Sequence, residues 1–400
     1  MQRPQTKPKV WVLNLDAEQE LSTRGSYTAP SALKRIVARQ RLPLLGSLVA
    51  PGDYVVLDDL EAGKGAPPQA AGTSEGERER AGAPSGAKPG RVLRLDPGLD
   101  AERALVSETL AAQDAASLAR HLQPVLDTGV LRNLPGHAWS PTPNALGLLR
   151  RFGAVVAPAP SLDILRQVNA RSFAAQLHAQ LALDPGTLTK HVASSLGEAL
   201  AALGQPAPLG WLVRRSFGAA GRGRMRIASL DSHRLTAAEQ SWLVASLAIG
   251  PLVLEPWVEV TQEFTRSAWL GTDGSVSISA PCLQGTNDAG AWSGSRRIST
   301  TEVARADDDA LGAAMESAGR ALHQAGYSGP FGIDAFRHRT GPGATALNPM
   351  SEINARFTMD WTCAMGEGPA SAVVVEPSDS TLANAQPAPT QAPKSPRTTP

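Results

Sequence analysis

The sequence predicts a protein of class α/β and α+β, in which a small N-terminal α/β unit precedes a larger unit of the α+β type. In the first 140 residues, short apolar runs of strand character alternate with helical spacing, which is typical of an α/β unit. From about residue 210 onward, short strands separated by turn residues predominate, as they do in antiparallel sheets. The 400 residues are 42% hydrophobic, which is enough to form the cores of two or three structural units.

The N-terminal unit is predicted at residues 1–140. Its strands are expected at three apolar runs, "KVWVLNL" (9–15), "YVVLDDL" (54–60) and "RVLRL" (91–95). Helical spacing of apolar residues predicts one helix in "SALKRIVARQRL" and another over 101–122. An insertion at 61–90 contains almost no large apolar side chain, and we expect it to be disordered.

The larger unit is predicted at residues 150–366, and a disordered Pro/Ala-rich tail is predicted at 367–400. Helices are expected at 191–203, 237–248 and 308–326. The last of these ends at Gly326, a residue suited to the left-handed position that follows a helix. Two strands, "PFGIDAFRHR" and "ALNPMSEINAR", are joined by "TGPGAT", which predicts a hairpin.

Composition excludes several classes of partner. The formal net charge is +1 and no basic stripe is present, so we expect no nucleic-acid partner. No stretch approaches the roughly 20 apolar residues of a membrane span, and the first apolar run is too short for a signal peptide. Cys282 and Cys363 form neither a disulfide framework nor a zinc-ligand pattern. We therefore expect a cytoplasmic protein with no membrane partner, and a homo-oligomer is left open.

Acidic and amide side chains occupy the predicted C-terminal hairpin at 330–357. Asp334 lies on its first strand, and Glu352 and Asn354 point to the same face of the second strand because they are two residues apart. Neighbouring strands lie about 4.8 Å apart, so these side chains can converge on one ion. Mg²⁺ is commonly bound by one or two carboxylates together with substrate phosphates. The alternative is a solvated sheet face with unrelated polar residues.

A glycine-rich loop separates two further predicted strands, in "RRSFGAAGRGRMRI". The loop contains Gly218, Gly221 and Gly223, and it follows Arg214 and Arg215. Glycines allow backbone N–H groups to approach phosphates closely. The stretch is not a P-loop, because that loop requires Gly-Lys-Ser/Thr. The alternative is an ordinary glycine hairpin.

The stretch "LVLEPWVEVTQEF" leads from a predicted buried strand through Glu255, Trp257 and Val258 to Glu263. A purine nucleoside requires apolar walls, a backbone donor and acceptor for the base edge, and a carboxylate for the ribose hydroxyls. An extended segment of this composition supplies all three. The alternative is a core strand that ends in a surface loop.

Taken in this order, these segments resemble the ATP-grasp superfamily. The resemblance covers residues 150–366, with a glycine flap at 214–224, an adenine crossover at 251–263 and a metal hairpin at 330–357. "EINAR" is the most specific part, because it matches the Glu-x-Asn-x-Arg strand of that superfamily. The resemblance implies ATP held between two α+β subdomains, and it makes the N-terminal unit a pre-ATP-grasp-like domain.

The resemblance also implies roles for individual residues. Glu255 and Val258 would hold the adenine edge, Trp257 would pack on the ring, and Glu263 would bind the ribose. Mg²⁺, or Mn²⁺ in its place, would be bound by Asp334, Glu352 and Asn354. The phosphates of ATP would be bound by Arg171, Arg214, Arg215, Gly218, Gly221 and Gly223. Arg356 would face the transferred phosphoryl group or the substrate carboxylate, and with Arg214 it would be catalytic.

The implied reaction is ATP-dependent ligation, in which a small-molecule carboxylate is activated as an acyl phosphate and an amine or thiol displaces the phosphate. The chain departs from the superfamily at two positions that usually hold lysine, which are Arg214 before the flap and Arg171 in the linker helix. Only seven of its 38 Lys and Arg residues are lysine, so this departure accords with the composition. Arginine keeps the charge but changes its geometry. Two alternatives are a non-catalytic nucleotide-binding protein and an ATP-grasp kinase that phosphorylates a small molecule.

Overall fold

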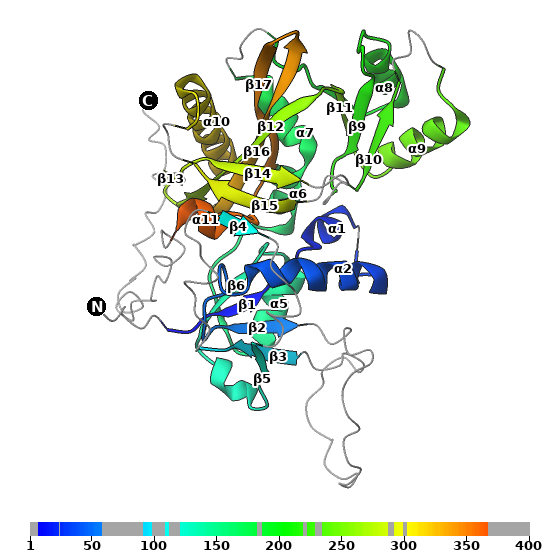
Figure 1. Cartoon of the computed structure of the whole chain (residues 1–400). Helices are drawn as coiled ribbons and strands as arrows, with labels where there is room; N and C mark the ends of the chain where they lie inside the picture. The colour runs from blue at the N-terminus through cyan, green and yellow to red at the C-terminus, as the bar shows by residue number, and fades with distance from the viewer. Residues whose placement is uncertain are drawn as a thin grey trace, which may run out of the picture.

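The computed structural model describes residues 7–23, 25–57, 91–97, 109–111, 121–181, 186–218, 222–228, 234–286, 292–298 and 302–366 (Figure 1). The predicted disordered segments at 61–90 and 367–400 lie outside these residues, as does Gly221. Three sheets organise the described chain, two in the upper half of the view in Figure 1 and one in the lower half. No helix within the described ranges is long and apolar enough to cross a bilayer.

The N-terminal sheet has six strands in the order β5-β3-β2-β1-β6-β7, in which β1 pairs in parallel with both β2 and β6. Its strands are β1 (Val10–Val12), β2 (Tyr54–Leu57), β3 (Arg91–Leu95), β5 (Leu122–Pro124), β6 (Pro135–Ala138) and β7 (Val155–Val156). The helices of this unit are α1 (Ala17–Ser22), α2 (Ser31–Arg41) and α5 (Pro143–Arg151), with 3-10 turns at Leu42–Leu44 and Thr128–Leu131. Val10 and Val12 enter one core and Trp11 the other, because alternate residues of a strand face opposite sides.

The second sheet is small and antiparallel, in the order β10-β9-β11-β8. Its strands are β8 (His191–Ala193), β9 (Trp211–Arg215), β10 (Arg224–Ile227) and β11 (Leu252–Pro256). Helices α8 (Leu196–Leu203) and α9 (Ala237–Leu247) accompany it, and Trp211, Leu203 and Leu243 share its core. A pair of helices with a four-stranded sheet forms the first α+β subdomain of the larger unit.

The third sheet is the largest, with strand order β17-β16-β12-β14-β15-β4 and β13 paired to β12. Its strands are β4 (Thr109–Ala111), β12 (Val260–Leu270), β13 (Val276–Ile278), β14 (Cys282–Thr286), β15 (Trp292–Arg297), β16 (Gly329–Gly341) and β17 (Ala344–Asn354). Its helices are α6 (Leu162–Asn169), α7 (Arg171–His178), α10 (Arg305–Gln324) and α11 (Trp361–Met365). The sheet and its helices form the second α+β subdomain.

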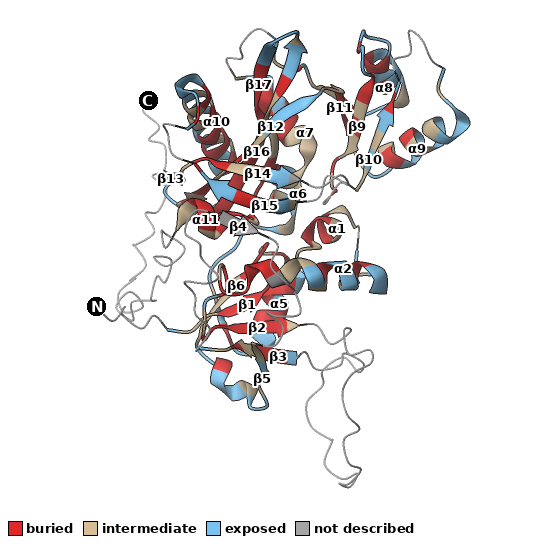
Figure 2. Cartoon of the chain, viewed as in Figure 1, coloured by how far each residue is buried: buried red, intermediate tan, exposed pale blue. Residues whose placement is uncertain are grey.

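The amphipathic helix predicted over 308–326 is α10, in which buried and exposed residues alternate (Figure 2). Leu311, Met315 and Leu322 lie at helical spacing in the main core of the large sheet or beside it. Gly326 follows the helix with φ of 84°, as the sequence predicts. The predicted hairpin of two long strands is also confirmed, because β16 and β17 pair antiparallel.

Two helix predictions are wrong in part. Residues 109–111, inside the helix predicted over 101–122, form strand β4, in which Leu110 pairs with Ser295 of β15. The rest of that prediction lies almost wholly outside the described residues. The helix predicted over 191–203 begins only at Leu196, because His191–Ala193 pair with β11. In both places the free edge of a neighbouring strand supplies backbone hydrogen bonds that override local helical spacing.

The structural units do not end at the predicted boundary of residue 140. Strand β4 precedes this boundary but extends the large sheet. Helix α5 and strand β7 follow it but join the N-terminal unit. The N-terminal unit also packs against the segment after β17. Phe357 and Trp361 share a core with Trp11 and Trp139, and the Phe357 N–H donates to the Trp139 carbonyl at 3.1 Å. This contact brings residues of the N-terminal unit to the end of the metal hairpin.

Candidate active site

A pocket of about 560 Å³ brings together most of the residues singled out in the sequence. The predicted residues that line it are Arg171, Arg214, Gly218, Glu255, Trp257, Val258, Glu263, Asp334, Glu352, Asn354 and Arg356. They come from strands of the small and large sheets, from the segments that follow β9, β11 and β17, and from α7. The N-terminal unit adds further lining residues, among them Glu18 and Trp139.

Two carboxylates face each other on the metal hairpin. Asp334 of β16 lies directly opposite Glu352 of β17, and the Asn354 amide donates to Asp334 Oδ2 at 3.1 Å. Burial raises the pKa of Asp334 to about 7, and the charges of Glu352 and Asp360 act in the same direction. A bound cation would offset the part of this pKa shift that comes from the charges of Glu352 and Asp360.

The donor set fits a hard divalent cation. Two carboxylates and an amide are oxygen ligands of the kind that Mg²⁺ takes when substrate phosphates complete its shell. Among the described residues, no group of three His, Cys, Asp or Glu side chains is placed to hold a metal on its own. The two carboxylates and the amide of the metal hairpin thus match the ligand chemistry of such a cation.

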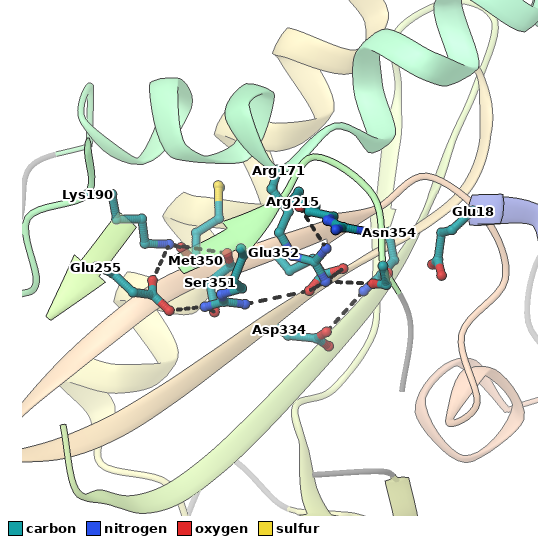
Figure 3. Close-up of polar contacts among 12 residues, drawn as sticks. Glu18, Arg171, Lys190, Arg215, Glu255, Asp334, Met350, Ser351, Glu352 and Asn354 are labelled. Carbon is teal, nitrogen blue, oxygen red and sulfur yellow. Dashed lines mark hydrogen bonds and ion pairs between the residues drawn. The ribbon is translucent and has the colours of Figure 1, made fainter. Parts of the chain in front are cut away.

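Arg171 connects the first turn of α7 to the metal hairpin and to the glycine flap. Its Nη2 lies 3.1 and 3.0 Å from the two oxygens of Glu352 (Figure 3). The same Nη2 donates to the Gly218 carbonyl at 2.7 Å. Sequence reasoning placed Arg171 at this site, and the structure brings it there. The charge-assisted contact couples the position of Glu352 to the flap.

Arg214 lies between two glutamates. Its Nη2 donates to Glu255 Oε1 and, at 3.2 Å, to Ser351 Oγ, and its Nη1 lies 3.9 Å from Glu352 Oε2. Burial opposes ionisation of Glu255, but Arg214 and Lys190 outweigh it, so the pKa of Glu255 is lowered. The side chain of Glu255 is thus held in an ion pair, which leaves its backbone for any contact with a base edge.

Lys190 is a buried member of this site that sequence reasoning missed. Its Nζ donates to the carbonyls of Met350 at 2.6 Å and Ser351 at 3.2 Å, and it lies 4.0 Å from Glu255 Oε2 (Figure 3). Burial lowers the pKa of Lys190 to about 8, although Glu255 opposes the shift. The local sequence "TLTKH" carries no motif, and scarcity of lysine in the chain is the one signal that could have drawn attention to it.

The flap glycines are required by close approach and by backbone conformation. A Cβ on Gly218 would lie 2.5 Å from the Arg222 carbonyl oxygen, and Gly223 has φ of 71°. Gly218 lines the pocket and Gly223 does not. A glycine hairpin of this shape brings the backbone close to Arg171.

Arg215 does not face the pocket. Its Nε donates to Ser246 Oγ at 2.8 Å, and its guanidinium lies over the Trp242 ring at 5.1 Å. Arg214 and Arg215 are neighbours on β9, so their side chains point to opposite faces of the sheet. Only the first of the two arginines is placed to meet a ligand in the pocket.

The crossover residues lie along one wall of the pocket. Arg226 covers the Trp257 ring at 4.7 Å, and the Trp257 N–H donates to the Gly210 carbonyl at 2.7 Å. Val258 and Glu263 also line the pocket, Glu263 from β12. This wall has the apolar and acidic character expected of an adenosine site.

The opposite end of the pocket is built partly by the N-terminal unit. Arg356 donates to Glu18 Oε1 and lies 5.7 Å from the centre of the Trp139 ring. Glu18 lies beyond Asn354 in Figure 3, far from Lys190 and Glu255. Within the described residues, Glu18 Oε2 and Asp360 Oδ2 have no hydrogen-bond partner. Nothing in the local sequence of Glu18 or Trp139 links them to Arg356, which lies more than 200 residues further along the chain.

Comparisons with known proteins found likenesses only among solved structures. No protein-family model and no curated protein matches the sequence. An N5-carboxyaminoimidazole synthetase from Staphylococcus aureus complexed with ADP is 12% identical, with a TM-score of 0.37, over 56% of this chain and 54% of that chain. A biotin carboxylase–βγ-ATP complex from Campylobacter jejuni is 13% identical, with a TM-score of 0.40, over 61% of this chain and 51% of that chain.

This chain therefore matches about half the length of those structures. The small sheet carries the glycine flap, and the large sheet carries the metal hairpin. The crossover from β11 to β12 joins the two sheets along one pocket. That arrangement is the one implied by the sequence motifs. The described part of the chain has two α+β subdomains with a pocket between them, which is the architecture that the resemblance implies.

Proposed function

We propose that this protein is a Mg-ATP-dependent ligase that activates a carboxylate as an acyl phosphate for attack by an amine or thiol. One observation carries the proposal, which is that a single pocket contains both carboxylates and arginines. The carboxylates are Asp334 and Glu352, which lie opposite each other. The arginines, whose guanidinium groups can bind phosphate, are Arg171, Arg214 and Arg356. Phosphoryl transfer is catalysed mainly by positioning and by neutralising charge, and these groups can do both.

The proposed nucleotide site runs along the pocket. Trp257, Val258 and Glu263 would hold the adenosine, and Arg171 with the flap backbone would hold the phosphates. Asp334, Glu352 and Asn354 would hold Mg²⁺, which when bound supplies charge neutralisation on the phosphate oxygens. The ion pairs of Arg171 and Arg214 with glutamates keep both guanidinium groups at the phosphate end of the pocket.

The proposed reaction has two steps. A carboxylate oxygen of the substrate attacks the γ-phosphorus, and the bond from that phosphorus to the ADP oxygen breaks. An amine nitrogen then attacks the acyl carbon, the carbon–oxygen bond to phosphate breaks, and the nitrogen loses a proton. Arg214 would stabilise charge on the transferred group, and Arg356 would orient the substrate carboxylate through a bidentate contact.

The end of the pocket beside Arg356 favours an amine as the second substrate. Glu18 and Asp360 are 7% and 3% exposed, and each has a carboxylate oxygen without a partner among the described residues. Buried acceptors without partners cost free energy, which an N–H donor of a ligand at this end of the pocket would recover. This charge distribution suits an amine better than a second anion.

A second candidate function is supported by one observation. Arg171 contacts both oxygens of Glu352, and Arg214 contacts Glu255, so both cations that replace the expected lysines are already paired. Such pairing would be retained in a protein that binds nucleotide without turnover. The two candidates are distinguished by turnover, because only the ligase would form ADP and a ligation product.

The test is ADP release from Mg-ATP, measured against pools of small carboxylates with and without pools of amines. Hydroxylamine in place of the amine converts an acyl phosphate to a hydroxamate, which can be detected directly. A ligase releases ADP in proportion to product. With hydroxylamine and the carboxylate but no amine substrate, it forms the hydroxamate. ADP formation with a phosphorylated hydroxyl product would indicate a kinase, and nucleotide binding with no ADP in any pool would contradict the ligase assignment.

A further inference from the structure

Lys190 lies behind the metal hairpin and outside the lining of the pocket. Its side chain is 1% exposed, and it immediately precedes β8 of the small sheet. Its hydrogen-bond acceptors lie on the large sheet, since Nζ donates to the Met350 and Ser351 carbonyls of β17. Removing an ammonium group from water costs free energy, so a lysine that is buried this fully must gain compensating contacts.

The first set of contacts that Lys190 makes is with a β-bulge in β17. Asp334 pairs with Glu352 and Phe336 pairs with Asn348, so two steps along β16 correspond to four along β17. The Met350 and Ser351 carbonyls, which accept hydrogen bonds from Lys190, belong to this bulged part of β17. Glu352 is the first residue after this bulge. The bulge therefore determines which residue of β17 lies opposite Asp334.

The second set of contacts that Lys190 makes is with a row of alternating charges, which we call the buried ion network. Its members are Lys190, Glu255, Arg214, Glu352 and Arg171. Lys190 lies 4.0 Å from Glu255, and Glu255 pairs with Arg214. Arg214 in turn lies 3.9 Å from Glu352, which pairs with Arg171 at 3.0 Å. Removal of Lys190 would leave Glu255 with Arg214 as its remaining partner in the network, drawing that guanidinium away from Glu352.

We propose that Lys190 is a positioning residue for the divalent-cation site, acting on Glu352 through both the bulge and the buried ion network. This rests on the proposed function, because the cation site is part of it. Lys190 links the small sheet to the metal hairpin, so it also fixes the distance between the two subdomains at the pocket. A lysine suits the role better than arginine, since a compact ammonium group can donate to two adjacent carbonyls.

The experiment compares Lys190→Met with wild type by calorimetric titration of ATP at a series of Mg²⁺ concentrations. We expect the Mg²⁺ concentration at half-maximal ATP affinity to rise about tenfold or more, because a charge-assisted contact that places Glu352 is lost. Binding of ATP without Mg²⁺ should change much less. Lys190→Gln, which retains an N–H donor, should recover part of the Mg²⁺ dependence, and Lys34→Met, at a partly exposed lysine of α2, serves as the matched control.

Each outcome decides between positioning and mere support of the fold. A Met variant that is less stable but keeps the wild-type Mg²⁺ dependence would overturn the inference and leave the proposed function intact. A wild-type protein that binds no Mg-ATP would overturn both. Where the Met variant does not fold, the Gln variant gives the same comparison, and an unchanged Mg²⁺ dependence in it would equally overturn the inference.

Discussion

Two of the three proposed Mg²⁺ ligands, Glu352 and Asn354, lie on the same strand, β17. The double variant Glu352→Gln with Asn354→Ala removes a carboxylate and an amide while leaving the apolar residues Ile353 and Ala355 in the core. We expect Mg-ATP binding to be lost, because one neutral amide cannot replace these ligands at the cation. Titration calorimetry measures the affinity, and circular dichroism checks that the fold is retained.

The matched control for that variant is Glu316→Gln together with Ser275→Ala, at exposed or surface positions outside the pocket. It should bind Mg-ATP as wild type does. Undiminished affinity in the Glu352 and Asn354 variant would show that the cation site lies elsewhere.

The buried ammonium group of Lys190 gives a pH dependence of stability with a definite sign. Burial lowers its pKa to about 8 from the ordinary 10.5, so the folded protein loses this proton first as the pH rises. Between these values the unfolded chain binds more protons at this group, and the free energy of unfolding therefore rises with pH. The gain is at most about 1.4 kcal/mol per pH unit.

This dependence is measured as the difference in unfolding free energy between wild type and Lys190→Met, in urea at a series of pH values from 7 to 10. The difference removes the contribution of all other titrating groups. It should change in favour of wild type above about pH 8. A difference that is flat across the range would mean that the ammonium group keeps its ordinary pKa in the folded protein.

At the scale of the elements, the glycine flap depends on the absence of a side chain at Gly218. Gly218→Val would bring a Cβ to 2.5 Å from the Arg222 carbonyl oxygen, which is backbone and cannot rotate aside. We expect the β9–β10 hairpin to open at a cost of about 1–3 kcal/mol, and Mg-ATP affinity to fall by about fivefold or more.

Gly341→Ala is the control for the flap, because a Cβ there meets nothing within 4 Å. It lies at the end of β16, far along the strand from Asp334. Calorimetry on the two variants tests whether the effect belongs to the flap. Wild-type affinity in the Gly218 variant would show that the flap does not shape the nucleotide site.

For the whole molecule, the aromatic core after β17 joins the N-terminal unit to the large sheet. Trp361 is 1% exposed, and its ring lies 5.0 Å from that of Phe357 in a core that includes Trp11. Trp361→Ala should reduce the free energy of unfolding by about 3–5 kcal/mol, because it leaves a large cavity. Chemical denaturation followed by fluorescence measures this loss.

Leu126→Ala is the reference substitution, since Leu126 is 97% exposed and should change stability by less than about 0.5 kcal/mol. If Trp361→Ala were equally harmless, the contact between the two units would contribute little to the fold. The same core contains Trp139, on which Arg356 rests, so we also expect the Trp361 variant to disturb the end of the pocket beside Glu18.

Local pattern was sufficient where an element contains its own signal. Helix α10 shows apolar residues at helical spacing and a glycine after its end, and the β16–β17 hairpin shows two alternating strands around a turn. Strands β4 and β8 were missed because short segments acquire strand structure only from a partner, and the partner strands β15 and β11 lie far along the chain. The burial of Lys190 was missed for the same reason.

The sequence by itself determined the order of the motifs, the α+β character of the larger unit, and the residue types available for an anion and a cation, because these depend on spacing and composition within short stretches. Only the tertiary structure decided which of Arg214 and Arg215 faces the pocket, that Arg214 and Lys190 both hold Glu255, and that Glu18 and Trp139 line the pocket. The physical reason is that burial and charge pairing depend on contacts between segments 40 to more than 300 residues apart, and no local pattern encodes those distances.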